Sequence, residues 1–268
     1  MNDYRRTSHE IDYRIYGEEM QCVEVELDPQ ETAVAESGAF MMMDDGVQMQ
    51  TIFGDGSQQQ MGGFLGKLVT AGKRLLTGEG LFMTAFTNIS HRKRKVYFAA
   101  PYAGKIIPLN LTTLGRKIIC QKDSFLCAAK GVSIGIEFQR RLGTGLFGGE
   151  GFIMQKLEGD GLAFCHAGGF VLERELQPGE LLKIDTGCIV AFQSTVDYDI
   201  QFVGGIKNTI FGGEGLFFAA LKGPGKVWIQ SLPVSRLASR ILSYATTNRK
   251  EEGSILGPLG NLLDGDGR

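Results

Sequence analysis

Short hydrophobic stretches separated by glycine-containing turns run through the whole chain. In three of them, polar and apolar residues alternate: CVEVEL (22–27), GVSIGIEF (131–138) and TVDYDIQF (195–202). This alternation is the period of a β-strand with one face toward water. Continuous apolar runs such as GFIMQKL (151–157) and GLFFAAL (215–221) are typical of strands covered on both faces. Short strands with frequent turn signals predict an all-β sandwich or barrel.

One turn motif occurs three times, and an apolar run follows it each time. The motif is a glutamate between glycines, in TGEGLF, GGEGFI and GGEGLF, and its glutamates are Glu79, Glu150 and Glu214. Their recurrence after 71 and 64 residues is typical of a duplicated supersecondary unit. Other segments align as well: 26–40 with 175–189, and 102–107 with 166–171. We therefore expect three tandem copies of one β unit around a pseudo-threefold axis.

These alignments and the flanking composition divide the chain into six predicted parts. They are an N-terminal extension (1–19), a first repeat (20–100) with an insertion (54–76), a second repeat (101–166), a third repeat (167–233), a C-terminal helix (234–249) and a flexible tail rich in glycine and leucine (250–268). Ser235 is the expected N-cap of the helix, and its inner face is expected to consist of Val234, Leu237, Ile241 and Leu242.

The repeated turn has two interpretations. Glycine takes a positive φ at little steric cost, and a glutamate between glycines can cap the N–H groups that such a turn leaves unpaired. Glu79, Glu150 and Glu214 are therefore expected to be structural turn residues. If the three turns met at the axis instead, the carboxylates would repel each other or require a cation.

Two segments outside the repeat are candidates for contacts with partners. Residues 62–76 of the insertion contain an apolar stripe, which predicts either a short segment closing an open end of the barrel or a helix on a membrane surface. Leu259, Leu262 and Leu263 in the tail are suited to contact with a partner subunit. The expected partners are a second copy of the chain, another protein or a membrane surface.

Composition limits the choice of compartment and partner. Glycine accounts for 38 of 268 residues, roughly twice its usual share, as many tight turns require. The formal net charge of −2 provides no long-range attraction for nucleic acid. No secretory signal and no apolar run of about 18 residues is evident. The five cysteines lack C-x-x-C spacing, and we expect buried, reduced thiols and a cytoplasmic location.

The run SHRKRKVYF (90–98) contains the candidate ligand-binding residues Arg92, Lys93, Arg94 and Lys95. Basic groups beside aromatic side chains suit RNA or anionic headgroups. The alternative is a solvated hairpin tip, because the equivalent turns of the other repeats, EGDG and KGPG, lack the basic residues. Together with the acidic balance, this makes nucleic acid an unlikely partner that is not excluded.

No catalytic or cofactor signature is evident. The histidines, His9, His91 and His166, lack the spacing of zinc ligands, and no nucleophile motif is present. We interpret His166 as a partly buried strand residue. The expectation is a protein without enzymatic activity, metal or cofactor; an enzyme with a site between repeats is an alternative.

With its triplicated β unit, its GEG turns, the insertion GGFLGKLVTAGKRLL (62–76) and its leucine/glycine tail, the chain resembles bacterial members of the altered-inheritance-of-mitochondria-24 family. The resemblance implies a fold similar to the tryptophan RNA-binding attenuation protein (TRAP-like), with each repeat a sandwich or short double-stranded β-helix. Fungal relatives are associated with the organisation of the mitochondrial inner membrane, which implies a scaffolding role. The expected function is therefore a binding or scaffold protein that self-assembles or lies at a membrane.

Overall fold

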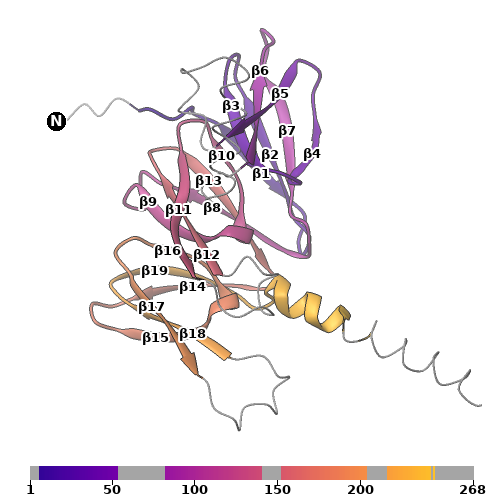
Figure 1. Ribbon diagram of the computed structural model, residues 1–268. Helices are drawn as coiled ribbons and strands as arrows, with labels where there is room; N and C mark the ends of the chain where they lie inside the picture. The colour runs from indigo at the N-terminus through magenta and orange to yellow at the C-terminus, as the bar shows by residue number, and fades with distance from the viewer. Residues whose placement is uncertain (1–5, 54–81, 141–151, 204–215, 243, 245–268) are drawn as a thin grey trace, which may run out of the picture.

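The chain is almost entirely β-structure in the part that the structure describes. The structure is a computed structural model that describes residues 6–53, 82–140, 152–203, 216–242 and 244 (Figure 1). These residues form nineteen strands, which lie in four sheets, and a helical segment at 234–242. The predicted β class and C-terminal helix are confirmed.

After β1 (Asp12–Tyr16), the strands form three consecutive groups of six. The first group consists of β2 (Cys22–Leu27), β3 (Thr32–Glu36), β4 (Phe40–Met43), β5 (Val47–Phe53), β6 (Phe82–Asn88) and β7 (Arg94–Ala99). The second consists of β8 (Gly104–Asn110), β9 (Lys117–Gln121), β10 (Phe125–Ala129), β11 (Ser133–Arg140), β12 (Phe152–Glu158) and β13 (Leu162–Gly168). The third consists of β14 (Val171–Leu176), β15 (Leu181–Asp185), β16 (Ile189–Gln193), β17 (Asp197–Val203), β18 (Leu216–Lys222) and β19 (Gly225–Gln230).

Each group has the same internal pairing. In the first, β7 pairs with β2 and β4, while β6 pairs with β3 and β5. Strands β13 and β12 take these roles in the second group. Strands β19 and β18 take them in the third. Every group therefore contributes three strands to one sheet and three to the next.

Neighbouring groups are joined edge to edge. Strand β3 of the first group pairs with β10 of the second, and β9 of the second pairs with β16 of the third, both antiparallel. Each junction completes a six-stranded sheet, in the orders β5-β6-β3-β10-β13-β8 and β11-β12-β9-β16-β19-β14. The two end sheets are smaller: β1-β2-β7-β4 and β15-β18-β17.

The three groups of strands follow one another from the top to the bottom of Figure 1, so that the two smaller sheets belong to the first and the last group. Hydrophobic side chains between neighbouring sheets form three cores. One core joins the first end sheet to the strands around β10, a second joins the two six-stranded sheets, and the third lies against the last end sheet. Residues of all three groups meet in the second core, for example Val34, Leu109 and Trp228.

The expected pseudo-threefold axis is not confirmed. A ring of three groups closed by the same pairing would require β15 to pair with β4. Among the described residues, β15 pairs with β18 and β4 with β7, and neither strand pairs with the other. The repeated turns with Glu79, Glu150 and Glu214 lie outside the described residues, as does the insertion at 54–76, so these predictions and the boundaries of the repeats stay predictions.

The strand patterns are confirmed in part. Phe152, Ile153 and Met154 are buried, as predicted for a strand covered on both faces. In β11, Ile134 is buried as expected, but a register shift between Ile136 and Phe138 interrupts the regular alternation.

The C-terminal helix begins at Val234, directly after Pro233, so Ser235 lies inside the helix and is not its N-cap. Its predicted inner face is only half-buried at Leu237 and is exposed at Ile241 and Leu242. No helix in the described ranges is long and apolar enough to cross a membrane.

Asp160 ties the segment before β1 to the turn between β12 and β13. Its buried carboxylate accepts hydrogen bonds from the backbone N–H groups of Thr7 (3.0 Å) and Ser8 (2.9 Å), and from the Thr7 hydroxyl (3.1 Å). Burial by itself raises the pKa of a carboxyl group, but these hydrogen bonds outweigh burial and lower the pKa of Asp160 to about 2.

We expect Asp160→Asn to lower the free energy of unfolding by about 2 kcal/mol near neutral pH and by much less at low pH. The folded pKa lies below the unfolded value of 3.8. The ionised carboxylate therefore stabilises the fold above about pH 4, and this contribution is lost as the pH falls toward about 2. Urea unfolding of both proteins across this range measures the difference. A difference that does not change with pH would contradict the assignment.

Candidate functional site

The predicted basic residues lie at the tip between β6 and β7. Asn88, which is fully buried, fixes this turn. Its side-chain amide donates to the carbonyl oxygens of Leu27 (2.8 Å) and Arg92 (2.7 Å), and its Oδ1 accepts from the backbone N–H of Ser90 (2.9 Å). The tip is thus an ordered turn that holds the following basic residues against β2.

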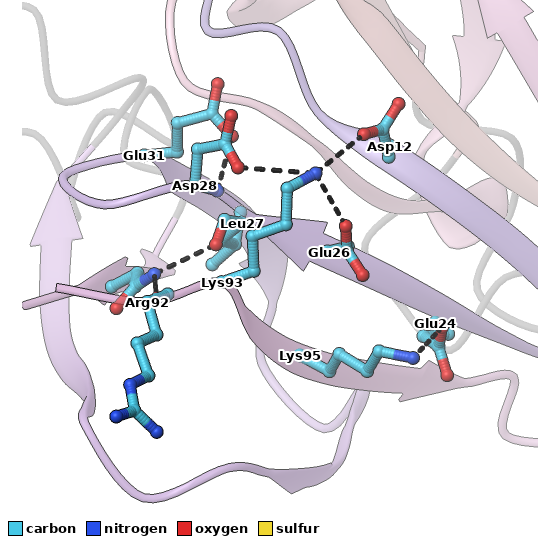
Figure 2. Close-up of polar contacts among 10 residues, drawn as sticks. Asp12, Glu24, Glu26, Leu27, Asp28, Glu31, Arg92, Lys93 and Lys95 are labelled. Atoms are coloured by element: carbon cyan, nitrogen blue, oxygen red, sulfur yellow. Dashed lines mark hydrogen bonds and ion pairs between the residues drawn. The ribbon is translucent and has the colours of Figure 1, made fainter. Parts of the chain in front are cut away.

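Lys93 faces carboxylates of the neighbouring segments (Figure 2). Its Nζ lies 2.8 Å from Glu26, 3.4 Å from Asp28 and 3.6 Å from Asp12. The hydrogen bond with Glu26, with the other carboxylates nearby, raises the pKa of Lys93 above its ordinary value. The lysine charge is therefore compensated within the protein.

Lys95 is paired in the same way. Its Nζ lies 2.9 Å from Glu24 (Figure 2). The Glu24 carboxylate also accepts hydrogen bonds from the Tyr16 and Tyr97 hydroxyls. Burial by itself raises the pKa of Glu24. The hydrogen bonds from Lys95 and the two tyrosines have the larger combined effect, so the pKa of Glu24 lies below its ordinary value. The alternation in CVEVEL placed Glu24 on a wet face; this was wrong, because these partners cover it to 6% exposure.

The other two basic residues do not complete a cationic surface. The Nε of Arg94 is buried without a hydrogen-bond partner among the described residues, and Arg92 points away from the carboxylates in Figure 2. Acidic side chains of β1, β2 and the turn after β2 thus pair with Lys93 and Lys95. The candidate ligand-binding role stays a prediction, and this geometry does not favour a polyanionic partner.

The other histidines and cysteines differ in burial: His91 is exposed and His9 is half-buried, whereas His166 is buried. His166 is 1% exposed, and burial lowers its pKa to about 4, so it is neutral at physiological pH. Cys120, Cys127 and Cys165 are buried free thiols, as predicted, whereas Cys22 and Cys188 are half-buried. In the described ranges, no cluster of three or more His, Cys, Asp or Glu side chains is arranged to hold a metal ion.

The most unusual exposed feature is strand β4, with the sequence FMMM. Its outer edge has no partner among the described residues, and Phe40, Met41 and Met42 are 40%, 51% and 47% exposed. The corresponding strands of the other groups are β10 and β16, because they pair with β13 and β19 through the same register shift. Residues at all three equivalent positions are buried there: Phe125, Leu126, Cys127, Ile189, Val190 and Ala191.

Strand β15 is the corresponding open edge at the other end of the molecule. Its counterparts β3 and β9 are each covered by a strand of the next group. In β15, Leu181 is 57% exposed, Leu182 is half-buried and Lys183 is exposed. The described chain thus ends in two sheet edges whose counterparts are both covered inside the fold.

A groove of about 200 Å³ adjoins the β4 edge, lined largely by apolar side chains, among them Met20, Cys22, Met41 and Tyr102. Met20 is 73% exposed. At the internal junctions, the equivalents of Met41 are Leu126 and Val190, which lie in hydrophobic cores. The edge and groove of β4, together with the edge of β15, form the candidate site, which we call the end edges. Sequence reasoning missed them; their one signal was the run of three methionines.

Comparisons with known proteins identify a family and two bacterial proteins of similar sequence or fold. The family described as Mitochondrial biogenesis AIM24 matches residues 13–232. An uncharacterized protein of Streptococcus pyogenes serotype M6 is 30% identical over 230 residues, which are 84% of this chain and 87% of that protein. A crystal structure of a Streptococcus pyogenes protein from a structural genomics consortium covers 88% of this chain and 100% of its own, with a TM-score of 0.68 and 23% identity. The last similarity concerns the fold alone.

Proposed function

This chain belongs to the Mitochondrial biogenesis AIM24 family, and we propose that it is a non-enzymatic scaffold protein that associates through its end edges. The observation that carries the proposal is the exposure of Phe40, Met41 and Met42 on an edge strand, whereas the equivalent residues of β10 and β16 are buried. An exposed apolar strand edge is a template for pairing with another chain, and proteins that stay monomeric usually block such edges.

We infer that the three strand groups are copies of one module. The inference is supported by their identical internal pairing and by the matching register shifts in β4, β10 and β16. A module whose faces and edges are covered only by its neighbours leaves uncovered surfaces at the ends of a row. Natural repeat proteins commonly cap such ends with polar residues, and β4 carries methionines there instead.

The non-enzymatic part of the proposal is supported by the burial of His166 and of three of the five cysteines. His166 is neutral and enclosed. A hydrogen bond with Cys165, together with burial, raises the pKa of the Cys120 thiol well above its ordinary value, and burial does the same for Cys127. A catalytic base or nucleophile needs access to its substrate. The free thiols also support the proposed cytoplasmic location, since disulfides are rare in reducing compartments.

The proposal is tested by the mass of the purified full-length chain in solution. We expect light scattering and sedimentation to give at least twice the mass of one chain at micromolar concentration. Met42→Lys places a charge on the exposed edge and should reduce the mass to that of a single chain. The matched control is Ile89→Lys, a similarly exposed apolar residue (54%) in the turn after β6, which should leave assembly unchanged. A monomer at all concentrations would refute the proposal.

A further inference from the structure

The two end edges are complementary to each other. At both internal junctions, a strand of the β3 type in one group pairs with a strand of the β4 type in the following group: β3 with β10, and β9 with β16. Two strands of these types lack such a junction partner among the described residues: β4, from the first group, and β15, which is the β3-type strand of the third group. One copy of the chain therefore presents the two different halves of a junction that it already makes twice.

Resting on the proposed function, we infer that β15 of one copy pairs antiparallel with β4 of the next, so that copies join head to tail. The resulting sheet has the order β17-β18-β15-β4-β7-β2-β1. Its first six strands reproduce the order of the two internal six-stranded sheets. Such a contact is heterologous, and it produces rings or open filaments according to the rotation between copies.

The internal junctions also fix the register. Ala35 lies opposite Cys127 and Val34 opposite Ala128, while Cys120 lies opposite Ala191 and Ile119 opposite Phe192. The internal pairings of the groups make Ile184 equivalent to Ala35 and Cys120, and Lys183 equivalent to Val34 and Ile119. The register shift common to β4, β10 and β16 makes Met42 and Met43 equivalent to Cys127 and Ala128. Met42 should thus lie opposite Ile184, and Met43 opposite Lys183.

The exposed side chains fit this contact. Leu126 and Val190, the equivalents of Met41, are 2% and 0% exposed because a neighbouring group covers them. The same arrangement between copies would cover Met41 and its groove with the third group of the preceding copy. On the other strand, Leu181 and Leu182 would lose the exposure that distinguishes β15 from β3 and β9.

Pairing of β15 with β4 fits two copies of the chain better than it fits one chain that closes on itself. Strand β4 lies near the top of Figure 1 and β15 near the bottom, with the second group of strands between them. A symmetric contact between two β4 strands has no counterpart among the junctions of the fold. The head-to-tail contact has two counterparts in the fold, the junctions β3–β10 and β9–β16.

Cysteine cross-linking tests the pairing directly. In full-length chains that also carry Cys22→Ser and Cys188→Ser, to remove the two half-buried thiols, we introduce Met43→Cys into one batch and Lys183→Cys into another. After mixing and oxidation with oxidised glutathione, we expect covalent dimers that contain one chain of each kind. Their yield should be at least about tenfold above either batch alone, since a disulfide requires Cα atoms closer than about 7 Å. One chain carrying both substitutions should give a ladder of covalent oligomers.

Controls separate this inference from the proposed function. Leu181→Cys is two residues from Lys183 on the same strand face and should cross-link to Met43→Cys far less. Covalent dimers of Met43→Cys alone would show a symmetric contact, and a cross-link within one chain in the double variant would show closure of the chain on itself; either overturns the head-to-tail pairing while assembly measured by mass still stands. Met42→Cys with Ile184→Cys repeats the test if Met43→Cys disturbs folding, as judged by circular dichroism.

Discussion

Replacing Phe86 by alanine is expected to lower the free energy of unfolding by about 3–5 kcal/mol. Phe86 is a residue of β6, is 1% exposed and packs against side chains of the first end sheet. Its ring packs edge-on against Phe98, with 5.1 Å between centroids, and stacks on Phe40 at 5.4 Å. Truncation removes both ring contacts and leaves a cavity that the surrounding strands cannot fill without moving. Urea or guanidinium unfolding, followed by tryptophan fluorescence and circular dichroism, measures the loss.

The matched control for this substitution is Phe170→Ala, since Phe170 is 67% exposed. It should change stability by less than about 0.5 kcal/mol. If Phe86→Ala does not fold, Phe86→Leu retains much of the volume and should be destabilised by a smaller, measurable amount. Equal effects of the two alanine substitutions would mean that the first core is not packed as described.

Gly104→Ala is expected to cost about 3 kcal/mol, because the first residue of β8 has no room for a methyl group. A Cβ at Gly104 would lie 1.9 Å from the carbonyl oxygen of Ala167 and 2.7 Å from Nε2 of His166. The closer of these atoms belongs to the backbone of β13, which cannot move away without breaking its pairing with β8. The N–H of Gly104 also donates to the Glu19 carbonyl (2.7 Å), so the strain would reach the connection to the first group.

Gly135→Ala, in β11, is the control for this second substitution. The nearest atom to its Cβ would be Cε of Lys156 at 3.3 Å, the end of a flexible side chain. Alanine there should be neutral or slightly stabilising, because it restricts the unfolded chain. Thermal melts of both variants make the comparison. A loss of stability at Gly135 equal to that at Gly104 would show that the effect is general to glycines in these strands.

The strands were predictable because their signal is local. Alternation in GVSIGIEF (131–138) places Val132 and Ile134 in the interior, where both are buried, and continuous apolar residues indicate the covered strand β12. His166 was predicted to be a partly buried strand residue; it lies in β13 and is almost completely buried. None of these predictions needed to know which strands are neighbours.

The partners of Glu24, Lys93 and Lys95 could not be predicted, because they depend on the pairing of β2 with β7. That pairing sets Glu26 opposite Lys95 and brings the acids of one strand beside the bases of the other. A basic run read alone suggests a surface for anions. When the basic run is considered together with its partner segment CVEVELD (22–28), the lysine charges are seen to be compensated within the protein.

The end edges were missed for a different reason. Strands β4 and β10 resemble each other in local pattern, and only their position in the row decides which of them has a neighbour. The buried cysteine and alanines of β10 and the exposed methionines of β4 are the residues in which the two positions differ. That contrast becomes interpretable only when the strand order is known.

Because the two end strands differ, a small fraction of defective chains would affect the assembly of the intact ones. In a head-to-tail array, a chain whose β4 is blocked but whose β15 is intact still joins a growing array and then terminates it. A minority of such chains would shorten the arrays built by an intact majority. In a symmetric dimer, a minority of blocked chains would not have this effect, because a blocked chain does not bind an intact one.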